Sequence, residues 1–202
     1  MTLRALRKLL TPLVVAVLFA GCCTPPVSES LPVTVHPQET SMWCWAASGE
    51  MVMDYLGHDV AQCTQANNRF GRTDCCNTPT PAQCVQGGWP EFAKYGFTAD
   101  HTADAALSWT DLRKQISRSR YCKKRPFAFT WHWPGGGGHM MVAKGYYNLR
   151  LAAVTLHLVE MIDPLPVGVG DVRWITYDYY VSSAGHHTHW DDYYNVTYTG
   201  GL

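Results

Sequence analysis

The sequence of 202 residues is poor in charge and has no excess of either sign. Only 16% of the residues are Asp, Glu, Lys or Arg, and the acidic and basic totals are both 16. Because binding to polyanions depends on positive charge, this balance favours neither a nucleic-acid partner nor a surface of anionic lipid. The sequence is not short of apolar residues, which make up 47% of the chain. It is therefore not a disordered protein, and we expect one folded domain with a sizeable core.

The chain begins with an apolar run that is too short to cross a bilayer comfortably. This run extends from Leu9 to Ala20, contains Pro12 and follows three basic residues, Arg4, Arg7 and Lys8. A transmembrane helix needs about 20 apolar residues, and proline disrupts a helix interior. A basic start followed by a short apolar run is typical of an export signal. We therefore expect residues 1–21 to be a signal peptide.

The end of this segment resembles the lipobox of bacterial lipoproteins. Phe19-Ala20-Gly21 precedes Cys22, with Phe where that motif usually has Leu. We expect Cys22 to be lipidated, with cleavage without lipid as the alternative. Both place the mature chain outside the cytoplasm, in the cell envelope (periplasm or outer membrane) or secreted. Residues 22–35 are rich in Pro and Ser and predict a tether before a domain over 36–202.

The eight cysteines include no CxxC pair. That absence argues against a zinc site, and cysteines in an exported chain favour disulfides. Neighbouring Cys75 and Cys76 should bond to different partners, because a bridge between adjacent cysteines is strained. We expect the pairs Cys63–Cys76 and Cys75–Cys84. Cys122 is left without an assigned partner.

Helical patterns come before strand patterns in this sequence. Apolar spacing predicts a helix from Cys44 to Gly57, and shorter helices follow Trp89 and Ser108. Beyond Cys122, runs rich in Val, Ile, Thr and aromatic residues predict strands over 126–133, 139–147, 152–163, 172–180 and 191–198. This order predicts an α+β fold.

Cys44 lies at the predicted start of a helix, where partial positive charge favours a thiolate. Gln38 precedes it by six residues and Trp45 follows it. This arrangement resembles the papain-like cysteine peptidases, which place an oxyanion-hole Gln six residues before a Cys-Trp at the head of the central helix. Ser41-Met42-Trp43 replaces the small residues of the papain signature, as in the bacterial effector and bacteriocin-processing branches.

The resemblance extends to the other residues that a nucleophilic cysteine needs. His139 follows four glycines and begins an alternating strand that ends at Gly145-Tyr146, like the Gly-His-apolar-Gly-Tyr strand of this family. Asp163 ends the next strand before Pro164, where a carboxylate would orient the imidazole. The resemblance implies a two-lobed domain, with a helical lobe around the central helix and an antiparallel β lobe. Asp178 and Asp191 are the fallback candidates for the third residue.

By this resemblance the chain hydrolyses peptide or isopeptide amides through a thioester. Cys44 is the nucleophile, His139 the base, Asp163 the orienting group and Gln38 an oxyanion donor. The partner is a protein or peptide substrate, with a membrane contact through lipid on Cys22. No cofactor or metal is implied, and a monomer is the default. The alternatives are a transglutaminase-like acyl transferase and a catalytically idle envelope lipoprotein that acts as a binding module.

One histidine cluster suggests another chemistry. His186, His187 and His189 lie close to Asp191 and Asp192, a composition that metal sites share. The sequence contains no HExxH helix to accompany it. We interpret the cluster as a polar loop between two strands.

Overall fold

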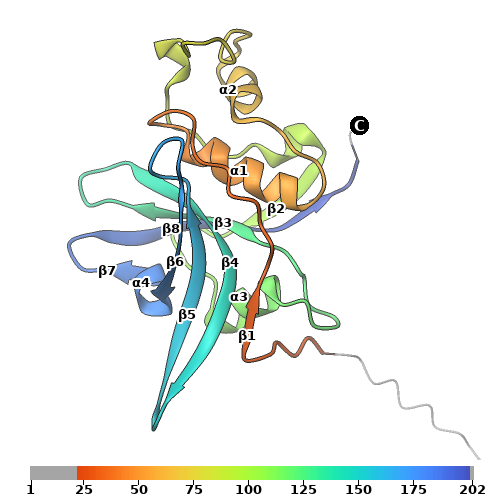
Figure 1. The fold of residues 1–202 in the computed structure, drawn as a ribbon, viewed down its shortest axis with the longest axis vertical. Helices are drawn as coiled ribbons and strands as arrows, with labels where there is room; N and C mark the ends of the chain where they lie inside the picture. The colour runs from red at the N-terminus through yellow and green to blue at the C-terminus, as the bar shows by residue number, and fades with distance from the viewer. Residues whose placement is uncertain (1–21, 201–202) are drawn as a thin grey trace, which may run out of the picture.

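The structure is a computed structural model that describes residues 22–200 (Figure 1). The predicted signal peptide, residues 1–21, lies outside the described residues. Within residues 22–200, no helix is long and apolar enough to span a membrane.

The helices are α1 (Cys44–Tyr55), α2 (Gln62–Phe70), α3 (Trp109–Ile116), α4 (Tyr177–Val181) and the 3-10 turns η1 (Ala82–Cys84) and η2 (Phe92–Tyr95). The strands are β1 (Ser28–Ser30), β2 (Phe97–His101), β3 (Phe127–His132), β4 (Gly138–Leu151), β5 (Val154–Asp163), β6 (Asp171–Thr176), β7 (Ser182–Ser183) and β8 (His187–Tyr198).

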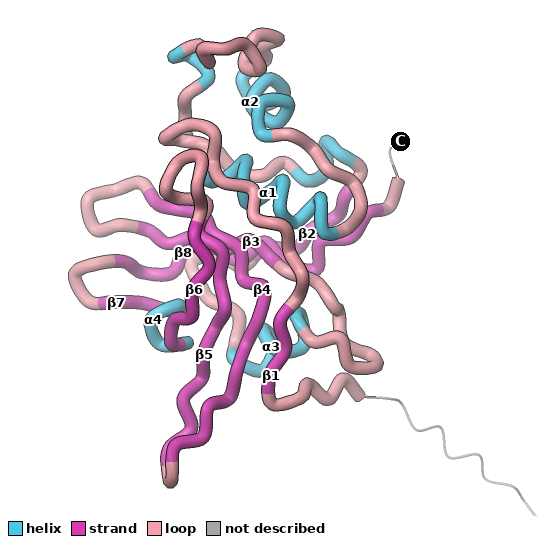
Figure 2. Tube along the Cα trace, viewed as in Figure 1, coloured by secondary structure: helices cyan, strands magenta, loops and turns pink. Residues whose placement is uncertain are grey.

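One antiparallel sheet contains all the described strands (Figure 2). Its main path runs β2-β8-β3-β4-β5-β6, while β1 pairs with β4 and β7 with β8. The C-terminal strand β8 therefore lies between β2 and β3. Mixed helices and an antiparallel sheet confirm the α+β class that the sequence predicts.

Helix α1 packs against β3 and β4 on one side and against α2 on another. This double cover explains why every residue from Trp45 to Met53 is buried. Two indole N–H groups attach the start of α1 to the loop after η1. Trp43 Nε1 donates to the Cys84 carbonyl at 2.7 Å, and Trp45 Nε1 donates to the Gln86 carbonyl at 3.1 Å. The N-terminus of α1 is thus attached to the segment from Cys84 to Gln86 at two points.

Disulfides join Cys63 to Cys76 and Cys75 to Cys84, the two pairs that the sequence predicts. The sequence leaves Cys122 without a partner, and here the structure differs. Cys122 is bonded to Cys23, at a sequence separation of 99 residues. Cys23 stands next to the predicted signal boundary, 99 residues before Cys122, so the pattern of spacings does not reveal this pair.

The predicted tether at 22–35 is packed onto the domain. Strand β1 pairs with β4, with Ser28 opposite Tyr147. Leu31 is fully buried, and Arg113 donates to the carbonyls of Pro25 and Pro26 at 2.9 and 3.0 Å. Because this segment is rich in Pro and Ser, its composition does not indicate the three-residue strand β1 or the burial of Leu31 in the core.

The C-terminal strands also differ from the prediction. Strand β8 begins at His187, so the expectation of a polar loop there is wrong: His187 and His189 are buried strand residues. The strand predicted over 172–180 ends at Thr176, whose side chain accepts a hydrogen bond from the Tyr179 N–H and caps α4. A local side-chain cap therefore overrides the β propensity of the tyrosines. Strand β2, which the sequence analysis did not predict, pairs with β8 at the edge of the sheet.

Candidate active site

Cys44 is the first residue of α1 and is half-buried in the wall of a cleft of about 360 Å³. Ser41, Trp45 and Gly88 line the cleft from the N-terminal half of the chain, and Trp133, His139 and Trp190 line it from the sheet. No side chain caps the start of α1. The N–H groups of its first turn therefore remain available to an anion at this point.

His139 lies at the start of β4 with only 7% of its surface exposed. The residue before it, Gly138, has no room for a Cβ, which would collide with the Trp131 carbonyl. The β4–β5 register places Val142 opposite Ile162, which brings the start of β4 beside the end of β5. His139 Nε2 and Asp163 Oδ1 are consequently 2.6 Å apart.

The remaining nitrogen of the His139 ring, Nδ1, is the one available to Cys44. Burial lowers the pKa of His139, but hydrogen bonds to Asp163 and Cys44 and the charges of both groups outweigh it and raise the pKa to about 9. Burial raises the pKa of Asp163, but His139, the Leu165 N–H and Arg173 outweigh it and hold that pKa below its ordinary value. At neutral pH these groups favour an imidazolium next to an ionised carboxylate.

The orientation of Asp163 is fixed by two further contacts. Leu165 N–H donates to Oδ1 at 3.0 Å, and Arg173 Nη2 donates to Oδ2 at 2.9 Å. Arg173 comes from β6 and also donates to Asp171. Sequence reasoning missed Arg173, because only the pairing of β5 with β6 brings it to Asp163.

Gln38 is buried in the segment before α1 but does not line the cleft. Its Nε2 donates to the Thr40 carbonyl at 2.7 Å, and its Oε1 has no hydrogen-bond partner among the described residues. A primary amide carries two N–H groups, so one remains for another acceptor. The backbone N–H of Gln38 donates to the Pro164 carbonyl, which links this segment to the residue after Asp163.

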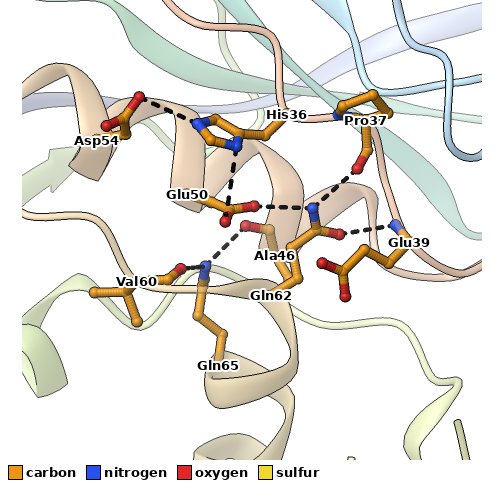
Figure 3. A network of polar contacts seen from close by, with 9 residues as sticks. All are labelled: His36, Pro37, Glu39, Ala46, Glu50, Asp54, Val60, Gln62 and Gln65. Atoms are coloured by element: carbon orange, nitrogen blue, oxygen red, sulfur yellow. Dashed lines mark hydrogen bonds and ion pairs between the residues drawn. The ribbon is translucent and has the colours of Figure 1, made fainter. Parts of the chain in front are cut away.

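A network of polar contacts holds the backbone on both sides of Gln38 (Figure 3). Gln62, at the start of α2, donates to the Pro37 carbonyl and accepts from the Glu39 N–H, both at 2.9 Å. It also donates to the buried Glu50 carboxylate at 2.9 Å. No sequence pattern points to Gln62, since a polar residue at the start of a short helix usually lies on the surface.

The same network includes His36. Its Nε2 is 3.1 Å from Asp54 Oδ2, and its Nδ1 is 3.7 Å from Glu50 Oε1. These contacts attach the segment before Gln38 to two successive turns of α1. The segment that carries Gln38 is therefore attached to α1 and α2 at several points.

The walls of the cleft are aromatic and closely packed. The Arg69 guanidinium lies 5.5 Å from the Trp45 ring centroid. A Cβ at Gly88 would lie 2.5 Å from Arg69 Nε and 2.7 Å from Trp45, so glycine is the residue that fits. On the other wall, the Trp133 ring is nearly parallel to the His139 ring at 6.3 Å. The cleft can bury an extended, largely apolar ligand.

The histidine cluster of His186, His187, His189, Asp191 and Asp192 has packing roles. His187 stacks on Trp131 at 3.9 Å, and its Nε2 is 2.7 Å from the Tyr179 carbonyl. Asp192 accepts hydrogen bonds from Tyr180 Oη and the Leu107 N–H. Within residues 22–200, the groups of side chains with metal-binding spacing do not include this cluster.

A thiol beside a carboxylate-bound imidazole is the kind of site that cysteine peptidases use. A sequence model of one such family, described as papain-like cysteine protease AvrRpt2, matches residues 27–164. The chain belongs to this family and is a papain-like cysteine peptidase of bacterial effector type. The search of curated proteins finds no match. The matched range contains Gln38, Cys44, His139 and Asp163, and it begins inside the segment that the sequence predicted to be a tether.

Proposed function

We propose that this protein hydrolyses peptide or isopeptide amide bonds with a Cys44–His139–Asp163 triad. One observation carries the proposal: the imidazole of His139 forms hydrogen bonds with both the Cys44 side chain and the Asp163 carboxylate at the wall of the cleft. This is the relation between nucleophile, base and orienting group that acyl transfer needs. Protein or peptide chains are the expected substrates.

The chemistry begins with the Cys44 thiolate and the His139 imidazolium. The thiolate attacks the scissile carbonyl carbon, and the C–N bond breaks as His139 passes its proton to the leaving amine. The product at this stage is a thioester on Cys44. Neutral His139 then takes a proton from water as the water oxygen bonds to the thioester carbonyl carbon. The C–S bond breaks, which releases the acid product and regenerates the Cys44 thiolate beside protonated His139.

The oxyanion that forms in each half-reaction needs hydrogen-bond donors. The backbone N–H of Cys44 at the uncapped start of α1 is one, and the second N–H of Gln38 is the other. Gln38 does not line the cleft, so we propose that its amide turns toward the oxyanion when substrate binds. Donors of this kind often tighten only when substrate is bound.

The proposed arrangement is that of a two-lobed papain-like domain. Helices α1 and α2, with the disulfide-bonded loops, form one side, and the sheet with His139 and Asp163 forms the other (Figure 1). Residues from both halves line the cleft, which supports this proposal. We further propose that the chain is exported, with residues 1–21 as its signal and lipid on Cys22.

Thiol reactivity and turnover test the triad. In a C22S background, Cys44 should react quickly with iodoacetamide at pH 5, where an ordinary thiol is almost fully protonated. His139→Ala should slow this reaction and abolish cleavage of a peptide library followed by mass spectrometry. His101→Ala, at an exposed histidine, is the matched control. If Cys44 alkylates no faster than free cysteine at pH 5, the triad assignment is wrong.

The same library separates hydrolysis from acyl transfer. Incubation in ¹⁸O water with an added primary amine should give products that carry ¹⁸O at the new carboxyl terminus. Products that carry the amine instead would assign the site to a transglutaminase-like reaction.

A further inference from the structure

The loop between α3 and β3, residues 117–126, concentrates positive charge in a chain with zero net charge. We call this segment the basic loop; its five cations are Arg118, Arg120, Lys123, Lys124 and Arg125. Arg118 pairs with Glu29, and Arg125 donates to Thr197. Arg120, Lys123 and Lys124 are exposed, and none is paired with a carboxylate of residues 22–200. Local charge is thus strongly positive where the overall composition shows balance.

The basic loop is a fixed structure. The N–H groups of Lys123 and Arg125 donate to carbonyls of α3, at 2.9 and 3.0 Å. Tyr121 and Lys124 have positive φ angles of 67° and 61°, a conformation that costs free energy for residues other than glycine. The disulfide from Cys122 to Cys23 ties the loop to the N-terminal segment. The surrounding contacts therefore hold the three unpaired cations outward.

An apolar projection lies on the same edge of the molecule. The β4–β5 hairpin extends beyond the body of the domain, and its tip exposes Leu151 at 51% and Val154 at 58% (Figure 1). In Figure 1 this tip, the N-terminal segment and the basic loop all lie along the lower edge. The turn from β3 to β4, which leads to His139, lies at the left of the picture, well above the hairpin tip.

We propose that the basic loop and the β4–β5 hairpin tip form a docking surface for an anionic phospholipid bilayer. Lys and Arg near a negatively charged leaflet are attracted to it, and exposed apolar side chains gain by entering the acyl boundary. Nucleic acid would satisfy the cations but would leave Leu151 and Val154 in water. None of these residues lines the active-site cleft, so contact with the bilayer would leave the cleft open to a substrate in solution.

The Cys23–Cys122 disulfide connects this surface to the proposed lipid on Cys22. An acyl chain on Cys22 would enter the bilayer beside the basic loop. The docking surface is nonetheless a property of the folded domain, so it can be tested without the lipid.

The test uses the full chain with Cys22→Ser and measures sedimentation with vesicles. Binding should be clear with vesicles of phosphatidylcholine and phosphatidylglycerol at a ratio of 7:3, weak with phosphatidylcholine alone, and reduced by salt. The triple variant R120A/K123A/K124A should weaken binding on the order of 10²-fold, because each charge near the surface contributes about 1 kcal/mol. R120K/K123R/K124R should retain binding.

Two further variants separate the contributions of charge and apolar contact. R72A/K94A removes two cations that have carboxylate partners elsewhere and should leave binding unchanged. L151S/V154S should lower the part of vesicle binding that persists at high salt, where the contribution of charge is screened. Equal binding to both vesicle types, or no loss in the triple variant, would overturn the proposal. Tighter binding to soluble nucleic acid than to anionic vesicles would also overturn it, as would a folded chain that binds only another protein.

Discussion

Asp163 has partners on both carboxylate oxygens, so neither the position nor the charge of this group depends on His139 alone. Oδ1 accepts from His139 and from the Leu165 N–H, while Oδ2 faces Arg173. A carboxylate held in this way stays ionised and in place when the imidazole moves or loses its proton. It can therefore fix the tautomer and orientation of His139 through both half-reactions.

The raised pKa of His139 sets the alkaline limit of the activity. The imidazolium is present below a pKa of about 9, so kcat/KM should fall as the pH rises through that value. The stabilising contribution of the same group is fully present below pH 6.5 and is lost as the pH rises through about 9. Asp163→Asn removes a partner that raises this pKa while burial continues to lower it. The alkaline limb should move to lower pH, and kcat should drop.

Asp171→Asn is the control for that pH profile, because Asp171 is exposed and also contacts Arg173. The alkaline fall of kcat/KM in this variant should stay near pH 9. An unchanged limb in the Asp163→Asn enzyme would show that another group sets the alkaline limit.

Gln38→Ala should separate transition-state stabilisation from thiol activation. We expect kcat to fall on the order of 10²-fold, as for the loss of one oxyanion donor. Alkylation of Cys44 at pH 5 should stay fast, because Gln38 is not a partner of the Cys44–His139 pair. Gln83→Ala, at an exposed position in η1, should have neither effect. Loss of alkylation in Gln38→Ala would indicate a structural role in place of the oxyanion role.

For single residues, the sequence reveals those whose role is indicated by their neighbours in the chain. The six-residue spacing from Gln38 to Cys44, the glycines before His139 and the proline after Asp163 are all visible in the chain. Arg173 is not, because its contact depends on the register of two strands joined by a loop. Sequence patterns do not define the register across such a loop.

Helix α2 acts on the site through a single side chain. Gln62→Ala should remove its hydrogen bonds to Pro37, Glu39 and Glu50 and destabilise the fold by about 1–3 kcal/mol. It should also lower kcat, because the backbone that carries Gln38 loses its clamp. The double variant Q38A/Q62A should be no slower than Gln38→Ala, since both changes act on the same donor.

Gln65→Ala provides the matched control in the same helix. Gln65 donates to the carbonyls of Ala46 and Val60 and is as deeply buried, but it has no contact with residues 37–39. It should lower stability in urea unfolding by a similar amount with kcat retained. If both variants lose kcat equally, Gln62 has only a structural role.

The Cys23–Cys122 disulfide holds the N-terminal segment, which includes β1, to the domain. The double variant C23S/C122S should lose about 2–5 kcal/mol of stability, because the disulfide closes a loop of about 100 residues in the unfolded chain. Urea unfolding measures this loss. Turnover at 25 °C should persist, since the bond lies outside the cleft lining. A dead but folded variant would show that the segment shapes the site.

The elements themselves were predicted unevenly. Strongly patterned segments such as α1 and β5 appear close to their expected positions, since apolar spacing and terminating residues agree there. The short β1 was missed because three residues carry too little periodicity, and its stability comes from β4. Tertiary pairing, which the local sequence does not report, decides such cases.

For the whole molecule, the proposed export predicts a defined mature N-terminus. The mature protein should begin at Cys22 and carry acyl mass, and it should partition into detergent. Intact-mass measurement of protein from the membrane fraction tests this. A C22S variant should lose the acyl mass and be cleaved differently or retained. An N-terminus elsewhere with no acyl mass would remove the lipoprotein proposal and leave the peptidase proposal standing.

The position of β8 has a consequence for how the molecule comes into being. Residues 187–198 follow β2 and β3 in the chain, yet they pair with β3 on one side and β2 on the other. Until they arrive, β2 has no partner strand and β3 has only β4, and pairings of such long sequence separation form slowly. A chain that emerges vectorially, N-terminus first, thus presents Cys44 long before the sheet behind it can close. The cleft, whose lining includes Trp190 of β8, is therefore complete only once that strand has emerged and inserted between β2 and β3.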